Sequence, residues 1–139
     1  MLKIVFDTNV YISAFLTKKG KAEEAFMLVV RGDVELYSSI PIITEMAGKL
    51  RGKFSWDDDS VKRSVKFVAA VANIVKPDDR IDLLKDDPDN RILECARHAG
   101  ADIIVTGDRH LLSLKVFEGI RILTIREFLD IYRRSASER

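Results

Sequence analysis

Four carboxylates stand where strands are expected to end or helices to begin. Asp7 directly follows the apolar run 2–6, and Asp108 comes after a second apolar run and a Thr-Gly pair. Glu45 and Asp89 fall early in two predicted helices. In open α/β sheets, the working site lies beyond the carboxyl ends of the parallel strands. We therefore expect these four acids to meet at one edge of the sheet.

Carboxylates that share a site repel one another, and this repulsion raises their pKa values. A divalent cation removes the conflict, and Mg²⁺ or Mn²⁺ prefers carboxylate oxygens and water as ligands. The chain has no Cys/His spacing typical of a zinc site, and His98 and His110 are isolated. The sequence thus predicts an Mg²⁺ or Mn²⁺ site whose ligands are Asp7, Glu45, Asp89 and Asp108.

Each of these acids also has a purely structural explanation. Aspartate is a favoured N-cap and complements the helix dipole in the first turn, so Asp7, Asp89 and Asp108 could each simply begin a helix. Glu45 could form a surface ion pair with Lys49, four residues later. Taken singly, each structural explanation is the stronger one. Their joint occurrence at one sheet edge favours a shared site.

Strands and helices alternate along the chain. Short apolar runs predict strands at residues 2–6, 34–38, 73–77, 102–106 and 120–124. Apolar residues at helical spacing predict helices near 9–16, 22–29, 40–50, 58–72, 88–99, 108–114 and 125–132. Such alternation implies right-handed crossovers and a parallel sheet between helical layers, so the fold class is α/β.

One aromatic residue invites a nucleic-acid interpretation. If Asp57 is the N-cap of the helix that follows, Trp56 and Val61 occupy the two positions of a hydrophobic staple. We therefore expect Trp56 to fix the entry of the chain into that helix rather than to stack on a base.

Size and composition restrict the remaining choices. The 139 residues, of which 47% are apolar, predict one domain over residues 1–134 and a frayed tail over 135–139. A net charge of +1 argues neither for nor against a nucleic-acid partner. Cys95 is the only cysteine, which excludes a disulfide within the chain. With no apolar stretch of membrane-spanning length, the expected location is the cytoplasm.

Several motifs resemble those of the PIN-domain ribonucleases, specifically the branch of toxin components from toxin–antitoxin pairs. The segment FDTNVYISAFL resembles the opening Asp-Thr-Asn motif of this family and carries Asp7. SSIPIITEM matches the segment with the second acid, Glu45, and DDPDNRILECARHAGADIIVTGDRHLL carries Asp89 and Asp108. The likeness runs nearly end to end. The choice of Asp89 over Asp87 rests on the motif register.

The resemblance implies a three-layer α/β/α sandwich and metal-dependent endonucleolytic cleavage of RNA, with Mg²⁺ or Mn²⁺ as cofactor. It also implies a cognate antitoxin protein and a homodimer, for which the early helices or Phe54 could supply an apolar patch. Four polar residues match positions near the family's site, where local capping is an equal explanation: Thr8, Asn9, Ser39 and Thr106.

An acidic site repels the phosphate backbone, so nearby cationic residues must offset it. Candidate RNA contacts flank the acids in sequence, although a solvated surface is the ordinary role of any one of them: Lys18, Lys19, Lys21, Lys49, Arg51, Lys53 and Arg109.

Three alternatives remain open. One is a housekeeping RNA-processing nuclease with the same chemistry, and another is a catalytically idle PIN fold that binds RNA or a partner. The third is a phospho-acceptor receiver domain, which needs an acidic pair after the first strand and a lysine after a later one. Here one acid follows the first strand and a later strand ends in TGD, so the receiver ranks lowest.

Overall fold

The computed structural model describes residues 1–137, which form a six-stranded sheet with the order β3-β2-β1-β4-β6-β5. All neighbouring strands pair in parallel except β5 and β6. The strands are β1 (Lys3–Phe6), β2 (Glu35–Ser38), β3 (Asn73–Ile74), β4 (Ile103–Val105), β5 (Val116–Phe117) and β6 (Ile120–Leu123). The predicted α/β class with a central, mostly parallel sheet is confirmed.

Seven helices occur at the places along the sequence where the apolar periodicity predicts them. They are α1 (Thr8–Leu16), α2 (Lys21–Val30), α3 (Ile40–Gly52), α4 (Asp58–Val71), α5 (Asp87–Ala99), α6 (Arg109–Leu114) and α7 (Ile125–Ser137). Among the described residues, no helix has both the length and the apolar character needed to cross a bilayer.

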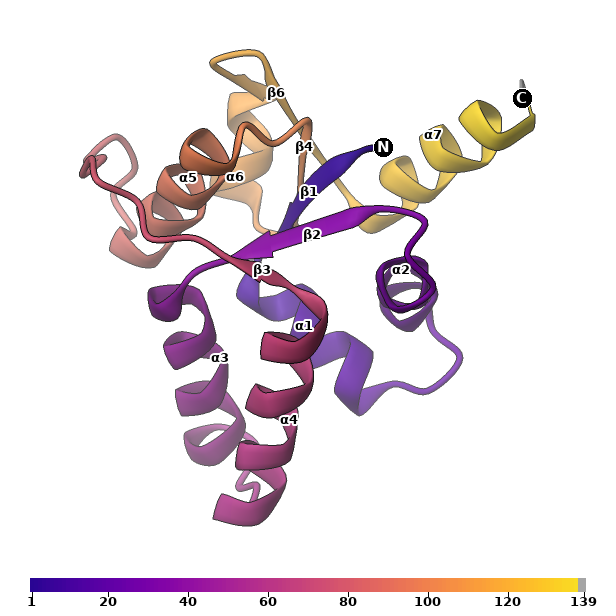
Figure 1. The fold of residues 1–139 in the computed structure, drawn as a ribbon. Coiled ribbons are helices and arrows are strands. Elements are labelled where there is room, and N and C mark those ends of the chain that lie inside the picture. Colours follow the sequence, from indigo (N-terminus) through magenta and orange to yellow (C-terminus); the bar gives the residue numbers. More distant parts are fainter. Residues whose placement is uncertain (138–139) are drawn as a thin grey trace.

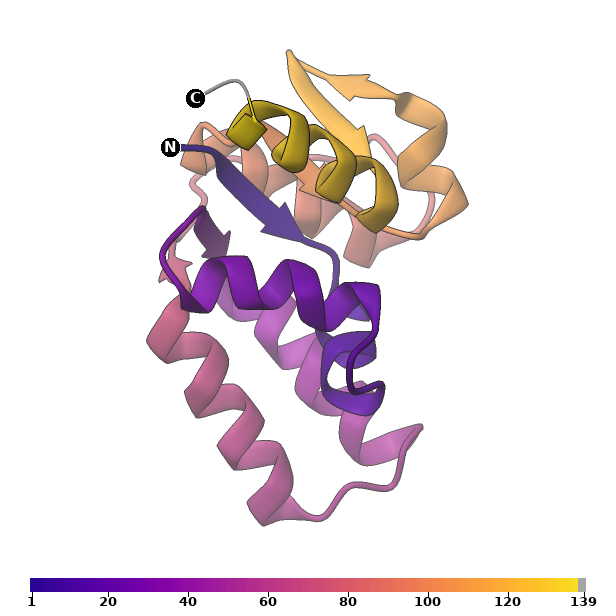
Figure 2. The ribbon, with the colours of Figure 1, turned by 90° about the vertical axis from the view of Figure 1, so that its right-hand side faces the viewer.

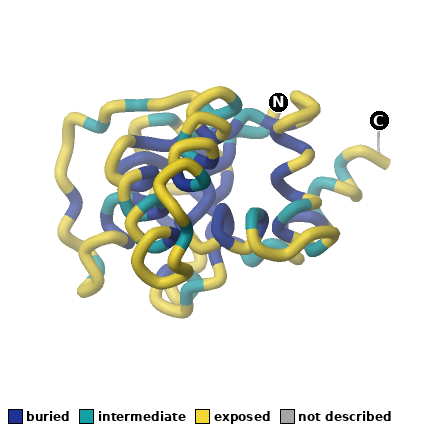
Figure 3. The backbone as a smooth tube through the Cα atoms, turned by 90° about the horizontal axis from the view of Figure 1, so that it is seen from below, coloured by how far each residue is buried: buried dark blue, intermediate teal, exposed yellow. Residues whose placement is uncertain are grey.

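The helices cover both faces of the sheet. α2 and α7 pack against each other on one face, which Figure 2 turns toward the viewer, and α5 contacts β1, β2 and β4 on the other. α3 and α4 form an antiparallel pair that extends away from the sheet (Figure 1). Buried residues concentrate along the strands and the helix faces that meet them (Figure 3). The central strands are therefore enclosed, as their unbroken apolar runs predict.

The pairing of β1 with β4 brings two distant parts of the chain together. Phe6 lies opposite Val105 in the parallel register, and the Asp7 N–H donates to the Val105 carbonyl at 2.9 Å. The residues that follow the two strands, Asp7 and Thr106, are consequently neighbours at the carboxyl edge of the sheet.

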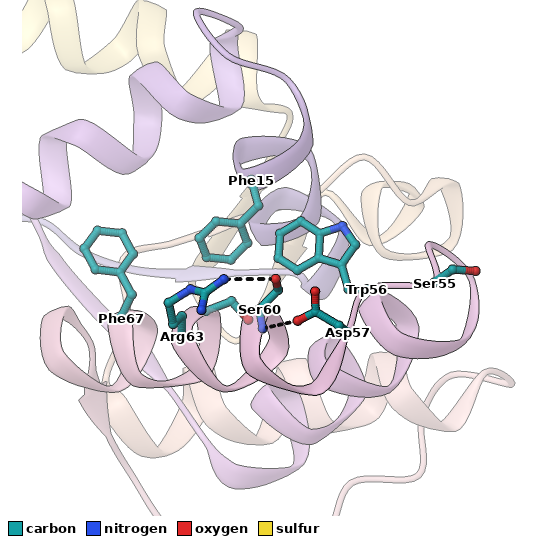
Figure 4. A pocket seen from close by; sticks show the side chains of 8 residues that line it. Phe15, Ser55, Trp56, Asp57, Ser60, Arg63 and Phe67 are labelled. Carbon is teal, nitrogen blue, oxygen red and sulfur yellow. Dashed lines mark hydrogen bonds between the residues drawn. The ribbon is translucent and has the colours of Figure 1, made fainter.

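The start of α4 agrees with the predicted N-cap. The Asp57 carboxylate accepts a hydrogen bond from the Ser60 N–H at 2.7 Å, and Val61 is buried. Trp56 packs beside Phe15, with ring centroids 6.3 Å apart, and Phe67 lies 6.5 Å from Phe15 (Figure 4). Trp56 thus joins an aromatic cluster between α1 and α4, as expected of a structural residue.

One strand of the sheet, β5, was not among the predicted elements. β5 pairs antiparallel with β6 through a hairpin turn at Glu118 and Gly119, which have φ values of 51° and 84°. The strand is only two residues long, and Val116 is exposed, so it has no apolar run by which to identify it. The otherwise parallel sheet therefore ends in an antiparallel edge strand.

The last helix is longer than predicted. α7 continues to Ser137, whose hydroxyl donates to the Arg133 carbonyl, so the helix includes residues 135–137 of the predicted tail. The last part of the predicted tail, residues 138–139, lies outside the described residues. Cys95 is buried, as expected of a small apolar residue, and burial raises its pKa to about 12.

Two glycines should respond in opposite ways to replacement by alanine. Gly100 ends α5 in the left-handed conformation (φ 65°), so Gly100→Ala should lower the free energy of unfolding by about 1 kcal/mol. Gly48 lies inside α3 with open space around its Cα, so Gly48→Ala should raise that free energy by about 0.5–1 kcal/mol. Urea denaturation measures both changes, and a shift of the same sign in both variants would contradict this account.

Candidate functional site

Asp7 is buried at the end of β1 and held by Thr106. The Thr106 hydroxyl donates to Asp7 Oδ2 at 2.7 Å, and Thr106 is itself fully buried. Burial raises the pKa of Asp7, whereas the Thr106 hydrogen bond, the Thr8 backbone and the charge of Lys49 oppose this rise. The Asp7 side chain makes no cap bond to α1, although Asp7 occupies the N-cap position. The capping explanation therefore does not account for this carboxylate.

Asp108 performs the capping role that its sequence context suggests. Its Oδ1 accepts hydrogen bonds from the His110 and Leu111 N–H groups, at 2.8 and 3.1 Å. The Asp108 N–H donates to the Thr106 hydroxyl oxygen at 2.9 Å. Thr106 therefore joins Asp7 and Asp108 through its hydroxyl group, and the second carboxylate oxygen of Asp108 has no cap bond.

Glu45 also makes the ion pair that its spacing suggests. Lys49 Nζ lies 3.0 Å from Glu45 Oε1 and donates to Asn9 Oδ1 at 3.3 Å. The same lysine acts electrostatically on Asp7. Lys49 is thus a cation within the acidic edge, and it links α3 to the first turn of α1.

Asp89 is the carboxylate whose surroundings are least compatible with a free negative charge. It is only 5% exposed, and its Oδ2 has no hydrogen-bond partner. These conditions raise its pKa to about 7. Burial is the largest cause, and four carboxylates supply the rest: Asp108, Asp86, Asp7 and Glu45. Asp89 thus feels the charge of each of the other three predicted acids.

The neighbouring acid, Asp87, has a different environment. Its side chain is 61% exposed, and its Oδ2 lies 3.5 Å from Arg80 and 3.4 Å from Arg91. Asp87 therefore sits in a surface ion-pair network, whereas Asp89 is buried with an unpaired Oδ2.

The predicted supporting residues differ in their bonding. The Thr8 hydroxyl is buried without a partner, and the Asn9 side chain accepts from Lys49. Ser39 is buried at the N-cap of α3 but makes no side-chain cap bond. Thr106 alone among these four bonds directly to one of the acids in the described chain.

The predicted RNA contacts are dispersed. Arg51 pairs with Asp58 at 3.0 Å, and Lys53 lies over the Phe54 ring. Lys18, Lys19 and Lys21 belong to the turn and first residue of α2, and Arg109 is exposed next to Asp108. Within residues 1–137, Lys49 is the one member of the set for which the structure shows a direct contact with an acid of the site.

The acidic edge suits a divalent cation by the chemistry of its donors, although it is not closed around one. As the side chains lie, no group of three or more His, Cys, Asp or Glu in the described chain is gathered closely enough to hold an ion. Thr106, Lys49 and the first N–H groups of α6 each engage one carboxylate. The buried Asp89 Oδ2 keeps an unused lone pair beside these like charges. An oxygen-preferring cation would satisfy this atom and offset the repulsion.

Two features near these acids were not predicted. Asp86 adds another negative charge beside Asp89, and Asn90 is fully buried and hydrogen-bonds to the backbone of Leu83 and Leu84. The acidic segment before α5 was visible in the sequence. Which of its acids would be buried, and which exposed, could not be predicted from the sequence.

The larger hollows of the surface do not contain the acids. One, of about 510 Å³, lies along α4 beside Phe15, Trp56 and Phe67 (Figure 4). Another, of about 710 Å³, lies between the start of α3 and the segment 74–80, and Arg91 and Glu94 form part of its wall. None of the four acids lines either hollow.

The sequence is similar to a protein family and to a protein of an archaeon. Residues 3–110 match the PIN domain. The uncharacterized protein MJ1680 of Methanocaldococcus jannaschii is 29% identical over 119 residues, which cover 82% of this chain and 76% of that protein.

Solved structures show the same fold at low sequence identity. VapBC-1 from nontypeable Haemophilus influenzae matches with a TM-score of 0.62 and 15% identity, covering 90% of this chain and 99% of that chain. VapBC2 from Rickettsia felis, bound to a DNA fragment from its promoter, matches with a TM-score of 0.61 and 12% identity, covering 87% and 97%. Since the PIN domain match spans most of the sequence, the chain belongs to the PIN domain family.

Proposed function

We propose that the protein is a divalent-metal-dependent endoribonuclease whose metal ligands are Asp7, Glu45, Asp89 and Asp108. The observation that carries this proposal is the buried, unpaired Oδ2 of Asp89 within reach of three other carboxylates. A structural role would leave this oxygen hydrogen-bonded, because an unpaired buried polar group costs about 1–3 kcal/mol. Membership of the PIN domain family gives the nuclease interpretation its general support.

The chain prepares this site for Mg²⁺ or Mn²⁺. When bound, such an ion supplies a Lewis acid for the attacked phosphate and lowers the pKa of a coordinated water. Thr106 fixes the orientation of Asp7, and the start of α6 fixes that of Asp108. Partners of this kind hold carboxylate ligands in place and sharpen their affinity for the metal.

Lys49 is suited to pair with Glu45 in the metal-free protein and with an RNA phosphate when a metal ion is bound. In the structure it neutralises Glu45 at 3.0 Å, and its side chain is 37% exposed. Once a cation compensates Glu45, the ammonium group is free to contact an RNA phosphate at the same edge. Thr8, Asn9 and Ser39 line the ends of the elements that carry the acids and are proposed to bond to substrate or ordered water. Arg109 is the next candidate RNA contact, because it directly follows Asp108.

We further propose that the protein is the toxin of a toxin–antitoxin pair, acts in the cytoplasm and forms a homodimer. The toxin proposal is supported by the similarity of the fold to the VapBC structures. A housekeeping RNA-processing nuclease would have the same site and the same chemistry. The two functions differ in the effect of expression on the host cell and in the existence of a neutralising partner.

RNA cleavage tests the nuclease function directly. Purified protein should cut a mixture of structured and single-stranded RNAs in Mn²⁺ or Mg²⁺, and EDTA should abolish the cutting. Asp7→Asn should reduce the rate on the order of 100-fold or more, because it removes a proposed metal ligand and its charge. Asp87→Asn, purified in the same way, should retain activity. Equal cutting by wild type and Asp7→Asn would identify a contaminating nuclease.

Asp89→Asn should stabilise the metal-free protein. The folded-state pKa of Asp89, about 7, lies above its ordinary value of 3.8, so its contribution to stability is present in acid and is lost as the pH rises to about 7. Asparagine avoids this loss. We expect a gain on the order of 1 kcal/mol at pH 8, or about 2–6 °C in the melting temperature.

Thermal unfolding in EDTA between pH 4 and 8 checks this, with Asp87→Asn as control. Added Mn²⁺ should stabilise wild type more than Asp89→Asn. An Asp89→Asn variant that is less stable than wild type at pH 8 in EDTA would show that the carboxylate has a structural partner.

Controlled expression separates a toxin from a housekeeping nuclease. Induction of the wild-type chain in a bacterial host should arrest growth, whereas Asp7→Asn, expressed to the same level, should not. Co-expression of the protein encoded beside it should relieve the arrest and co-purify with the chain. Normal growth with an enzyme that cuts RNA in vitro would favour the housekeeping function.

A further inference from the structure

Two hollows of the surface meet at Arg121 on β6. One, of about 490 Å³, lies beside the β5–β6 hairpin and reaches Leu123 and Thr124 at the carboxyl end of β6. The other, of about 330 Å³, lies between β6 and the C-terminal half of α7, beside Arg134 and Ser135. Arg121 lines both hollows, so they are adjacent, and we call the two together the β6–α7 groove.

The groove lies where the edge strand β5 is too short to cover its neighbour. β5 pairs with β6 only at Ile120 and Arg121, and beyond them no strand of the described chain pairs with the outer edge of β6. α7 packs against β6 from one face. In Figure 2, the β5–β6 hairpin, in orange, lies beside α7, in yellow. The open edge of β6 therefore forms one wall of the groove and α7 another.

One end of the groove is joined to the acidic edge by backbone hydrogen bonding. The Thr106 N–H donates to the carbonyl of Leu123, a residue of the groove, at 2.9 Å. The hydroxyl of the same threonine donates to Asp7. From Ile125, just beyond β6, α7 extends to Arg134, about 13 Å away at about 1.5 Å per residue. The groove thus begins beside the proposed metal ligands and leads away from them.

The charges that line the groove are mainly positive. Lys115, Arg121 and Arg134 are exposed there, and none of them forms an ion pair within residues 1–137. Glu127 is the one acid among the described lining residues, and it accepts from the Thr124 N–H at 2.9 Å in a capping box. Hydrogen bonding to Thr124 and the charge of Arg121 lower the pKa of Glu127. The groove therefore presents three cations and one carboxylate that is already engaged.

The next arginine of α7 serves a structural purpose that Arg134 does not. Arg133 bonds to Glu24 of α2 and lies 3.8 Å from Asp130, so it ties the two helices together. Arg134 instead lines the same hollow as Arg121. Like charges that lie close together repel each other, and a bound anion would relieve this repulsion. The pattern favours an anionic partner for the groove.

We propose that the β6–α7 groove binds the phosphate backbone of the RNA substrate on one side of the cleavage site. This inference rests on the proposed function, because it takes RNA as the substrate. Guanidinium groups bind phosphates in a bidentate manner, and a positively charged groove that follows the backbone is typical of proteins that bind single strands. The described lining includes no aromatic ring on which a base could stack, so the contacts are independent of base sequence.

Two variants of equal charge isolate the groove. The groove variant, Arg121→Gln with Arg134→Gln, removes two positive charges from the groove. The control variant, Lys62→Gln with Lys66→Gln, removes two from the exposed surface of α4. Any effect of net charge alone should appear in both. All four side chains are exposed, so both variants should fold as wild type does, which thermal unfolding checks.

Fluorescence anisotropy with a labelled single-stranded RNA, in EDTA so that the RNA is not cut, measures binding. The groove variant should bind on the order of 10-fold more weakly near 0.1 M salt, and the control variant less than about 2-fold more weakly. The slope of log affinity against log salt concentration should become shallower by about 1.4 in the groove variant, about 0.7 for each lost phosphate contact. Equal affinities of the two variants, with a wild type that binds and cuts RNA, would overturn the groove and leave the proposed function intact.

Cleavage kinetics in Mn²⁺ place the groove relative to the cleavage site. The groove variant should raise KM and leave kcat unchanged, because a remote phosphate contact is made equally in the ground state and the transition state. Of two RNAs, each shortened on one side of the cleavage site, one should be cut equally by wild type and groove variant. A difference that persists with both shortened RNAs would contradict a contact on one side.

Two further outcomes would overturn the proposal. If the groove variant loses affinity for polyglutamate but not for RNA, the groove belongs to an acidic protein partner. A wild-type chain that neither binds nor cuts RNA would overturn the proposed function together with the groove.

Discussion

The arrangement of the carboxyl edge depends on electrostatic repulsion between acids that the fold forces together. Asp7 and Asp89 are buried, and Asp89 carries the influence of four other carboxylates. Three local partners limit the repulsion: the Thr106 hydroxyl, the Lys49 ammonium and the first N–H groups of α6. Asp89 Oδ2 has none of them. The fold therefore accepts an energetic cost at one atom, and such costs are typical of sites prepared for a ligand.

Most of the architecture follows from patterns that the sequence displays. Short apolar runs located β1, β2, β3, β4 and β6, and helical spacing located all seven helices of the described chain. The N-cap at Asp57 was predicted with its physical reason. β5 could not be predicted, because two residues and a tight turn produce no periodicity. The length of α7 was underestimated because its last turn has no core residue to mark it.

The acids themselves were predictable, but their environments were not. Position after a strand pointed to Asp7 and Asp108, an early place in a predicted helix pointed to Glu45 and Asp89, and the motif register chose Asp89 over Asp87. Which acids cap, which form ion pairs and which remain unpaired depends on side-chain geometry. Asp7 shows the difference, because its N-cap position suggests a capping bond that its carboxylate does not make. Asn90 lies next to Asp89 and shows no sequence signal for its bonds to a preceding loop.

The bond between Thr106 and Asp7 spans 99 residues of sequence. Closing so long a loop costs conformational entropy before the contact repays it, which makes pairings of this kind late events in folding. During synthesis, Asp7 leaves the ribosome long before β4 exists to receive it. The acidic edge is consequently assembled only when nearly the whole chain is available. A nascent or truncated chain has the first acids but not the frame that brings them together, so maturation of the site is tied to completion of the fold.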